Sequence, residues 1–333
     1  MAAPLPVAEV IPPLEPGALE LTEEEAAFMK TLTGIQDVEE LKRHIVDVQA
    51  KAYKVYYYPC IRSFHFTKLK ISRLPAYKYL MQLKDDRPGA ILLDAGCCSD
   101  RATVGNDLRK AVADGWPVEN AIATDLEAEF WKYGHELFKS TPETFPAGFI
   151  AGDLLSDETL TPQTRFYTPP TTARPSNLQS LKSLTPLNGH ISAIHASSFF
   201  HLFDEERQAN LAKRLASLLS PEPGSIIFGR HGGLPEKGSR EVHSMKTDVK
   251  VFCHSPESWK ELWDGEVFEK GSVRVNVELK VVERPGPGVR IFSREGEEGK
   301  AYLLVCVIAF PDVCFPEKVL QEYYKKAMSK KGC

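Results

Sequence analysis

The sequence predicts an α/β protein built on a mostly parallel β-sheet, and three observations lead to this prediction. Short apolar segments recur along residues 90–228 and alternate with stretches of helical periodicity, which is the pattern of right-handed β-α-β units. Three of these apolar segments end in an aspartate. Two longer apolar segments near residue 300 flank a polar, glycine-rich stretch. We expect them to form an antiparallel hairpin at the sheet edge.

The parallel strands are expected in five places, at residues 90–95, 121–124, 148–152, 190–196 and 225–228. The hairpin strands are expected at 273–282 and 301–310, and helices at 103–115 and 127–140. A further helix is predicted to begin after Asp204, a residue type that caps helix N-termini. Leucines recur there at helical spacing until Pro221 ends the helix, so we expect these leucines in the core.

The expected domain organisation follows the same pattern. Residues 1–22, rich in proline and acids, are predicted to be a flexible tail or a clasp over the body, and residues 23–85 a helical cap. The sheet domain is predicted at 86–315 and a C-terminal helix at 316–333. Residues 156–189 are too rich in proline, serine and threonine for a strand. We expect them to form an insertion over the active-site edge, either as a lid or as a surface loop.

Composition excludes several classes of protein. The chain is 43% hydrophobic and 26% charged with a net charge of −4, so a nucleic-acid partner, which needs a basic surface, is not expected. There is no apolar run of membrane-spanning length and no secretory signal pattern in residues 1–21, which predicts a cytoplasmic protein. Seven cysteines without C-x-x-C spacing favour reduced thiols and no metal. For the adjacent Cys97 and Cys98, packing is preferred over a redox or metal role.

Asp94, Asp125 and Asp153 follow three successive apolar strands. In an open α/β sheet, ligands bind at the carboxyl ends of the strands. The dinucleotide pattern G-x-G-x-x-G is absent, and an acid two residues before Gly96 favours a cationic ligand over a pyrophosphate. A carboxylate at Asp125 can accept from both ribose hydroxyls, and one at Asp153 from an adenine amino group. Each acid alone fits a helix cap or turn, but together they predict a site for S-adenosylmethionine.

The segments Leu93-Asp94-Ala95-Gly96-Cys97-Cys98 and Ser197-Ser198-Phe199-Phe200-His201-Leu202-Phe203 carry a family resemblance. Over residues 43–263 the chain resembles class I S-adenosylmethionine-dependent methyltransferases, in the fungal secondary-metabolite branch that includes meroterpenoid methyltransferases. The resemblance implies a Rossmann-like sheet, this cofactor and a small-molecule substrate. This chain departs from the family at residues 99–106, where the family has a shorter Phe-Gly-Gln-Asp-like turn. The expected cofactor contacts are Tyr58, Asp94, Gly96, Cys97, Asp125, Leu126, Asp153, Leu154 and Ser197.

The predicted reaction is O-methylation of an apolar secondary metabolite. A carboxylate acceptor is already ionised near neutral pH, whereas a hydroxyl needs a base, and we rank the carboxylate slightly higher. Transfer to nitrogen or carbon is the alternative. His195 and His201 are the candidate catalytic residues, each weighed against a packing role. The candidate substrate contacts, each also a candidate core residue, are Phe200, His231, Met245, His254 and Trp263.

Two readings from other classes stay open on the sequence. A nicotinamide-dependent oxidoreductase is disfavoured by the missing glycine pattern. A catalytically silent methyltransferase-like protein is compatible with the altered turn at 99–106. The oligomeric state is left open, with a homodimer as one option.

Overall fold

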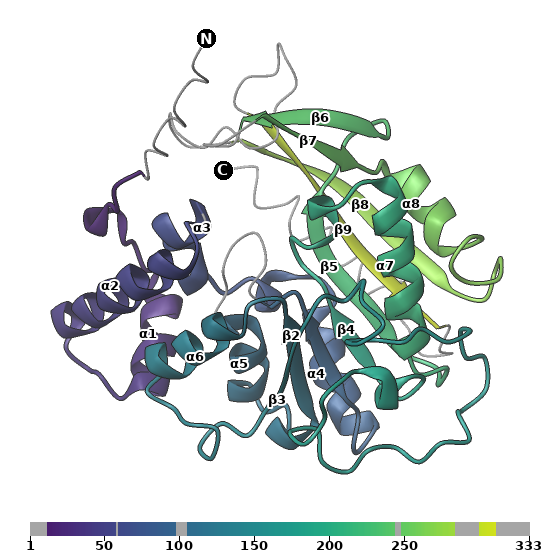
Figure 1. Ribbon diagram of the computed structural model, residues 1–333, viewed down its shortest axis with the longest axis horizontal. Coiled ribbons are helices and arrows are strands. Elements are labelled where there is room, and N and C mark those ends of the chain that lie inside the picture. Colours follow the sequence, from purple (N-terminus) through teal and green to yellow (C-terminus); the bar gives the residue numbers. More distant parts are fainter. Residues whose placement is uncertain (1–11, 58, 98–104, 244–247, 284–299, 311–333) are drawn as a thin grey trace, which may run out of the picture.

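The computed structural model describes residues 12–57, 59–97, 105–243, 248–283 and 300–310 (Figure 1). Its centre is a seven-stranded sheet with the strand order β3-β2-β1-β4-β5-β9-β8. The strands from β3 to β5 pair in parallel, and β9 pairs antiparallel with both β5 and β8. The predicted fold class is therefore confirmed. The strands are β1 Leu92–Ala95, β2 Ala121–Asp125, β3 Gly148–Ala151, β4 Ala193–His195, β5 Ile226–Gly232, β8 Arg274–Glu283 and β9 Lys300–Ala309.

Helices cover both faces of this sheet (Figure 1). One apolar core joins the sheet to α1 Glu23–Thr33, α2 Val38–Val55, α4 Tyr77–Asp86, α5 Asn106–Ala113 and α6 Ala128–Leu137. The other joins it to α7 Glu205–Leu218 and α8 Pro256–Trp263. The sheet contributes side chains to both cores. Of two neighbouring residues in β1, Leu92 belongs to the first core and Leu93 to the second. Because side chains alternate along a strand, a sheet covered on both faces needs continuous apolar strands.

Helix α7 begins where the sequence predicts. The Asp204 carboxylate accepts a hydrogen bond from the Arg207 N–H at 2.8 Å, and Leu211, Leu215 and Leu218 are fully buried. The cap satisfies one of the N–H groups that a helix start leaves without an intrahelical partner.

The N-terminal helices pack into the same core as the sheet. Asp107, in the first turn of α5, accepts hydrogen bonds from the backbone N–H groups of Lys70 at 3.0 Å and Ile71 at 2.8 Å. These residues open a short 3₁₀ helix, Ile71–Arg73. The described part of the predicted tail is also packed, because Tyr53 donates to the Pro12 carbonyl at 3.1 Å and Arg62 to the Pro13 carbonyl at 2.9 Å. The domain boundaries stay a prediction, and the helix expected at 316–333 lies outside the described residues.

The insertion does not lie where the sequence analysis placed it. Its leucines, among them Leu160 and Leu178, join the core beneath α7. Arg174 then donates to the Asn120 side chain at 2.6 Å, and Asn120 directly precedes β2. The segment therefore crosses one face of the sheet and reaches the amino ends of the strands. The expectation of a lid over the carboxyl edge was wrong, because apolar side chains hold the segment against the core instead.

Two further features were not predicted. A separate two-stranded antiparallel sheet pairs β6 Gly238–His243 with β7 Asp248–Cys253, in a region expected to hold no strand. Strand β5 also continues to Gly232, four residues beyond its predicted end. In the described part of the chain, no helix is long and apolar enough to cross a membrane.

Candidate active site

The strand order reverses between β1 and β4, since β2 and β3 follow on one side and β5 on the other. In open α/β sheets this switch point forms a crevice at the carboxyl edge, where ligands bind. Asp94 and His195 are paired in register across it, on neighbouring strands. They share the sheet face of Leu92 and Ala193, which is covered by the N-terminal helices.

A continuous hydrogen-bonded chain crosses this point. The Asp94 Oδ1 atom lies 2.8 Å from His195 Nδ1, and His195 Nε2 lies 2.7 Å from Ser197 Oγ. The backbone N–H of Arg230 donates to the same serine oxygen at 3.2 Å. The side chains of Asp94 and His195 are only 4% and 2% exposed. Burial raises the pKa of the Asp94 carboxyl, although the adjacent His195 acts in the opposite direction.

One acceptor atom in this hydrogen-bonded chain has no donor among the described residues. Among the described residues, Asp94 Oδ2 is buried and has no hydrogen-bond partner. A buried carboxylate oxygen is costly to leave without a donor. A cationic donor satisfies it best, because charge-assisted hydrogen bonds are the stronger ones. The site therefore fits the amino group of a cofactor such as S-adenosylmethionine.

Of the other predicted acids, Asp125 ends β2 and Asp153 lies just beyond the end of β3. Asp125 Oδ1 accepts from the Glu127 N–H at 3.3 Å, and Asp153 Oδ1 accepts from the Leu155 N–H at 2.9 Å. Both therefore form the local turns that their residue type favours. Gly96 follows β1 with a φ of 69°, a backbone conformation that glycine adopts without strain. The structure thus brings Asp94, Gly96, Asp125, Asp153 and Ser197 to one edge of the sheet.

The remaining expected cofactor contacts differ in exposure. Cys97 is buried, and its N–H donates to the Thr124 carbonyl at 3.2 Å. Leu154 is buried as well, whereas Leu126 is 63% exposed. Tyr58 and most of the altered turn at 99–106 lie outside the described residues.

The expected substrate contacts gather in another layer. The His231 ring lies 5.5 Å from that of Phe200 and 4.3 Å from that of Trp259, and Trp259 lies 5.7 Å from Trp263. These aromatic residues belong to the core beneath α7 and α8, on the opposite sheet face from Asp94 and His195. A contact with the substrate stays a prediction for these residues, and Met245 lies outside the described residues.

Three buried histidines meet at this cluster. The His201 ring accepts from the Gly232 N–H at 3.4 Å, and the His254 ring lies 2.9 Å from the Ser258 hydroxyl. Burial lowers the pKa of His254 to about 4 and holds the pKa of His231 well below its usual value. All three imidazoles pack among aromatic rings or backbone, and both ring nitrogens of His231 are buried without a partner among the described residues. The candidate roles of these histidines stay predictions.

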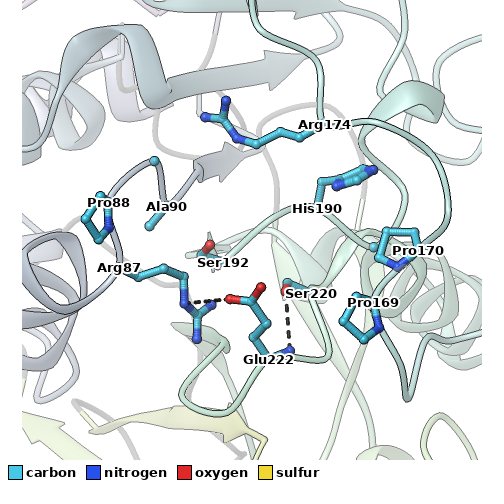
Figure 2. Close-up of a pocket in the computed structure, with 12 residues that line it drawn as sticks. Arg87, Pro88, Ala90, Pro169, Pro170, Arg174, His190, Ser192, Ser220 and Glu222 are labelled. Atoms are coloured by element: carbon cyan, nitrogen blue, oxygen red, sulfur yellow. Dashed lines mark hydrogen bonds and ion pairs between the residues drawn. The ribbon is translucent and has the colours of Figure 1, made fainter.

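A pocket lies at the opposite edge of the sheet (Figure 2). It is lined by residues that precede β1, β4 and β5, together with Pro169, Pro170 and Arg174 of the insertion. Arg87 and Glu222 form an ion pair in its floor at 3.0 Å. This pocket faces the amino ends of the strands, so it is separate from the candidate active site.

Comparison with known proteins identifies the chain. Residues 15–67 match the family model described as "Meroterpenoid methyltransferase N-terminal domain". The O-methyltransferase phiE of a fungal species is 32% identical over 257 residues, which cover 76% of this chain and 75% of that protein. The chain belongs to this methyltransferase family. The methyltransferase is also 28% identical to methyltransferase trt5 of Aspergillus terreus over 77% of this chain and 82% of that protein.

The O-methyltransferase atr3 of Stereocaulon alpinum is a further relative, 31% identical over 75% of this methyltransferase and 63% of that protein. Among solved structures, an N1-methyltransferase of Burkholderia thailandensis is 15% identical, with a TM-score of 0.44 over 92% of this chain and 95% of that one. The predicted family and enzyme class are confirmed. Family membership removes the oxidoreductase alternative.

The hydrogen-bonded chain itself escaped the sequence analysis. Asp94, His195 and Ser197 were each singled out, but their connection was not. Asp94 and His195 are 101 positions apart, and only the pairing of β1 with β4 makes them neighbours. An acid and a histidine at equivalent positions of two buried strands were the available signal.

Proposed function

We propose that this methyltransferase transfers the methyl group of S-adenosylmethionine to an oxygen of an apolar small molecule, with a carboxylate ranked above a hydroxyl. The observation that carries the proposal is the unmatched Asp94 Oδ2 atom at the switch point, beside the acid that ends β2. The names of two relatives, both O-methyltransferases, support oxygen as the acceptor atom.

The cofactor would lie along the carboxyl edge. Asp125, 7% exposed at the end of β2, would accept from the ribose hydroxyls. A carboxylate has about four acceptor sites, so its turn bond to Glu127 is compatible with this contact. Asp153 would accept from the adenine amino group, and Asp94 and Ser197 would bind the amino-acid end. The bound cofactor supplies an electrophilic methyl group on a positively charged sulfur.

The state of the two candidate histidines supports a carboxylate acceptor. His195 has one ring nitrogen beside Asp94 and the other beside Ser197. His201 is 5% exposed and its Nδ1 accepts from a backbone N–H. These contacts engage both ring nitrogens of His195 and one of His201, which supports a reaction that needs no histidine base. A carboxylate, ionised at neutral pH, needs no base, so the protein would act by holding the two reactants in line.

The cofactor assignment is tested with Asp125→Ala. Loss of hydrogen bonds to a charged group should weaken binding of S-adenosylhomocysteine by about 1.5–3 kcal/mol in calorimetry. Asp85→Ala is the control, because Asp85 is exposed and pairs only with its neighbour Lys84 in the described chain. Unchanged affinity in Asp125→Ala would remove the ribose assignment.

The acceptor class is tested with matched pairs of carboxylic acids and their alcohol analogues. Turnover of the acids and not of the alcohols is expected, with His201→Gln retaining activity. If His201→Gln folds but loses turnover, a hydroxyl acceptor is favoured instead. Absence of turnover across a broad panel, with the cofactor bound, would favour a catalytically silent protein.

A further inference from the structure

We propose that Asp94, His195 and Ser197 act as one unit that fixes the direction of the Ser197 hydroxyl, so that its oxygen accepts a hydrogen bond from the cofactor's α-ammonium group. This inference rests on the proposed function and assigns the role of these three hydrogen-bonded residues within it. Ser197 touches the cofactor, and His195, which lies behind Ser197, is a positioning residue.

The proton positions follow from the chemistry of the three groups. An ionised carboxylate can only accept, so His195 Nδ1 carries the proton and donates to Asp94 across 2.8 Å. The other nitrogen of a neutral imidazole can then only accept. Ser197 must therefore donate its hydroxyl proton to His195 Nε2 across 2.7 Å. The buried acid thus determines the direction of a hydroxyl two groups away.

This leaves the serine oxygen as an acceptor. A hydroxyl oxygen has two lone pairs, and the Arg230 N–H occupies one of them at 3.2 Å. Ser197 is partly exposed, whereas Asp94 and His195 are buried, so the chain leads from the core toward the crevice. At the same switch point, Asp94 Oδ2 is a further buried acceptor, with no partner among the described residues. An ammonium group has three donors, and the remaining lone pair of the Ser197 oxygen can accept one of them.

The same distances occur in a Ser-His-Asp hydrolase triad, but the surrounding backbone argues against a nucleophilic serine. The Ser197 oxygen already accepts a backbone N–H. The next N–H along the chain, that of Ser198, donates to the Arg230 carbonyl at 2.6 Å. That N–H is therefore engaged and does not face an oxyanion. The geometry points to binding and not to acyl transfer.

The experiment compares two ligands by calorimetry. S-adenosylhomocysteine contains the α-ammonium group, and 5′-methylthioadenosine lacks the whole amino-acid end. Ser197→Ala and His195→Asn should each weaken S-adenosylhomocysteine by about tenfold, the loss of one hydrogen bond to a charged group, and leave methylthioadenosine unchanged. His195→Asn is chosen because the shorter amide can still donate to Asp94 but cannot reach Ser197. Ser192→Ala, at the amino end of the same strand, is the control and should change neither affinity.

Coupling between the two residues distinguishes a unit from two separate contacts. The double variant His195→Asn/Ser197→Ala should bind S-adenosylhomocysteine as either single variant does. Additive losses, or equal losses for both ligands, would overturn the inference. Asp125→Ala should weaken the binding of both ligands. A wild-type protein that binds neither ligand would disprove the proposed function, and this inference with it.

A second measurement does not depend on the variants folding. Nitrogen-15 NMR of the wild-type protein reports which ring nitrogen of His195 carries the proton. A protonated Nδ1 with an unprotonated Nε2 at neutral pH is expected, and the opposite tautomer would overturn the inference.

Discussion

The two edges of the central sheet differ in the hydrogen bonding of their polar side chains. At the amino edge, Arg87 pairs with Glu222 and donates to the Ser225 hydroxyl at 2.8 Å, and His190 lies 3.1 Å from the Thr172 hydroxyl. At the carboxyl edge, Asp94 Oδ2 is buried without a partner in the described part of the chain. A fold tolerates such an atom where a ligand completes it. The unmatched acceptor at the carboxyl edge therefore supports the proposal that the cofactor binds there.

The largest effect is expected from Gly229→Ala, which would break the carboxyl edge itself. A Cβ atom at this position would lie 1.9 Å from the Ala196 carbonyl oxygen, and both groups are backbone of paired strands. Separating β4 from β5 should cost more than about 3 kcal/mol of unfolding free energy, measured by denaturant titration. Gly238→Ala is the control, because nothing lies within 4 Å of its added Cβ. A similar stability for both variants would contradict the close approach.

The second prediction concerns acid. His254 is neutral in the fold with a pKa of about 4, whereas an unfolded histidine titrates near 6.5. The unfolded state binds more protons between these values, so stability is complete above pH 6.5 and is lost as the pH falls toward 4. In His254→Asn, the loss of unfolding free energy between pH 6.5 and pH 4 should be smaller by about 2–3 kcal/mol. Unfolding curves recorded at both pH values measure this difference. His190→Asn, at the more exposed amino edge, should change the pH dependence less.

The third prediction separates binding from stability. Burial raises the pKa of Asp94, so the folded state disfavours its charge, and this penalty grows as the pH rises above the unfolded value near 4. At pH 7 the ligand-free Asp94→Asn protein should therefore be at least as stable as the wild type. It should bind S-adenosylhomocysteine about tenfold more weakly, or about 1.4 kcal/mol. A clear loss of thermal stability with unchanged affinity would reverse the assignment of Asp94.

The smallest effect is expected from Arg87→Met at the amino edge. Its partner Glu222 is 52% exposed, and exposed ion pairs contribute less than about 1 kcal/mol. Unfolding free energy should fall by roughly that amount, with cofactor affinity unchanged in calorimetry. Weaker cofactor binding in this variant would show that the two edges are coupled.

Local sequence patterns predicted the elements that local chemistry determines. The strand ends at Asp94, Asp125 and Asp153 lie at one edge as expected, and Asp204 caps α7. These features depend on residues adjacent in the chain, so apolar periodicity and cap residues are enough to find them.

Features set by distant partners were not predictable in this way. The β6–β7 pair depends on residues that give no clear alternation. The insertion was misplaced because its course is set by Leu178 beneath α7 and Arg174 against Asn120. The packing of His231 was not predictable either, since nothing in its sequence neighbourhood reveals Phe200 and Trp259 beside its ring.

The bond from Asp107 to the N-terminal segment has a practical consequence. Asp107 lies in the first turn of α5, and its carboxylate accepts hydrogen bonds from the backbone N–H groups of Lys70 and Ile71. The rate at which these N–H groups exchange with solvent deuterium therefore reports the local stability of that helix. Slower exchange on adding S-adenosylhomocysteine would reveal cofactor binding in the native protein, with no label or substitution.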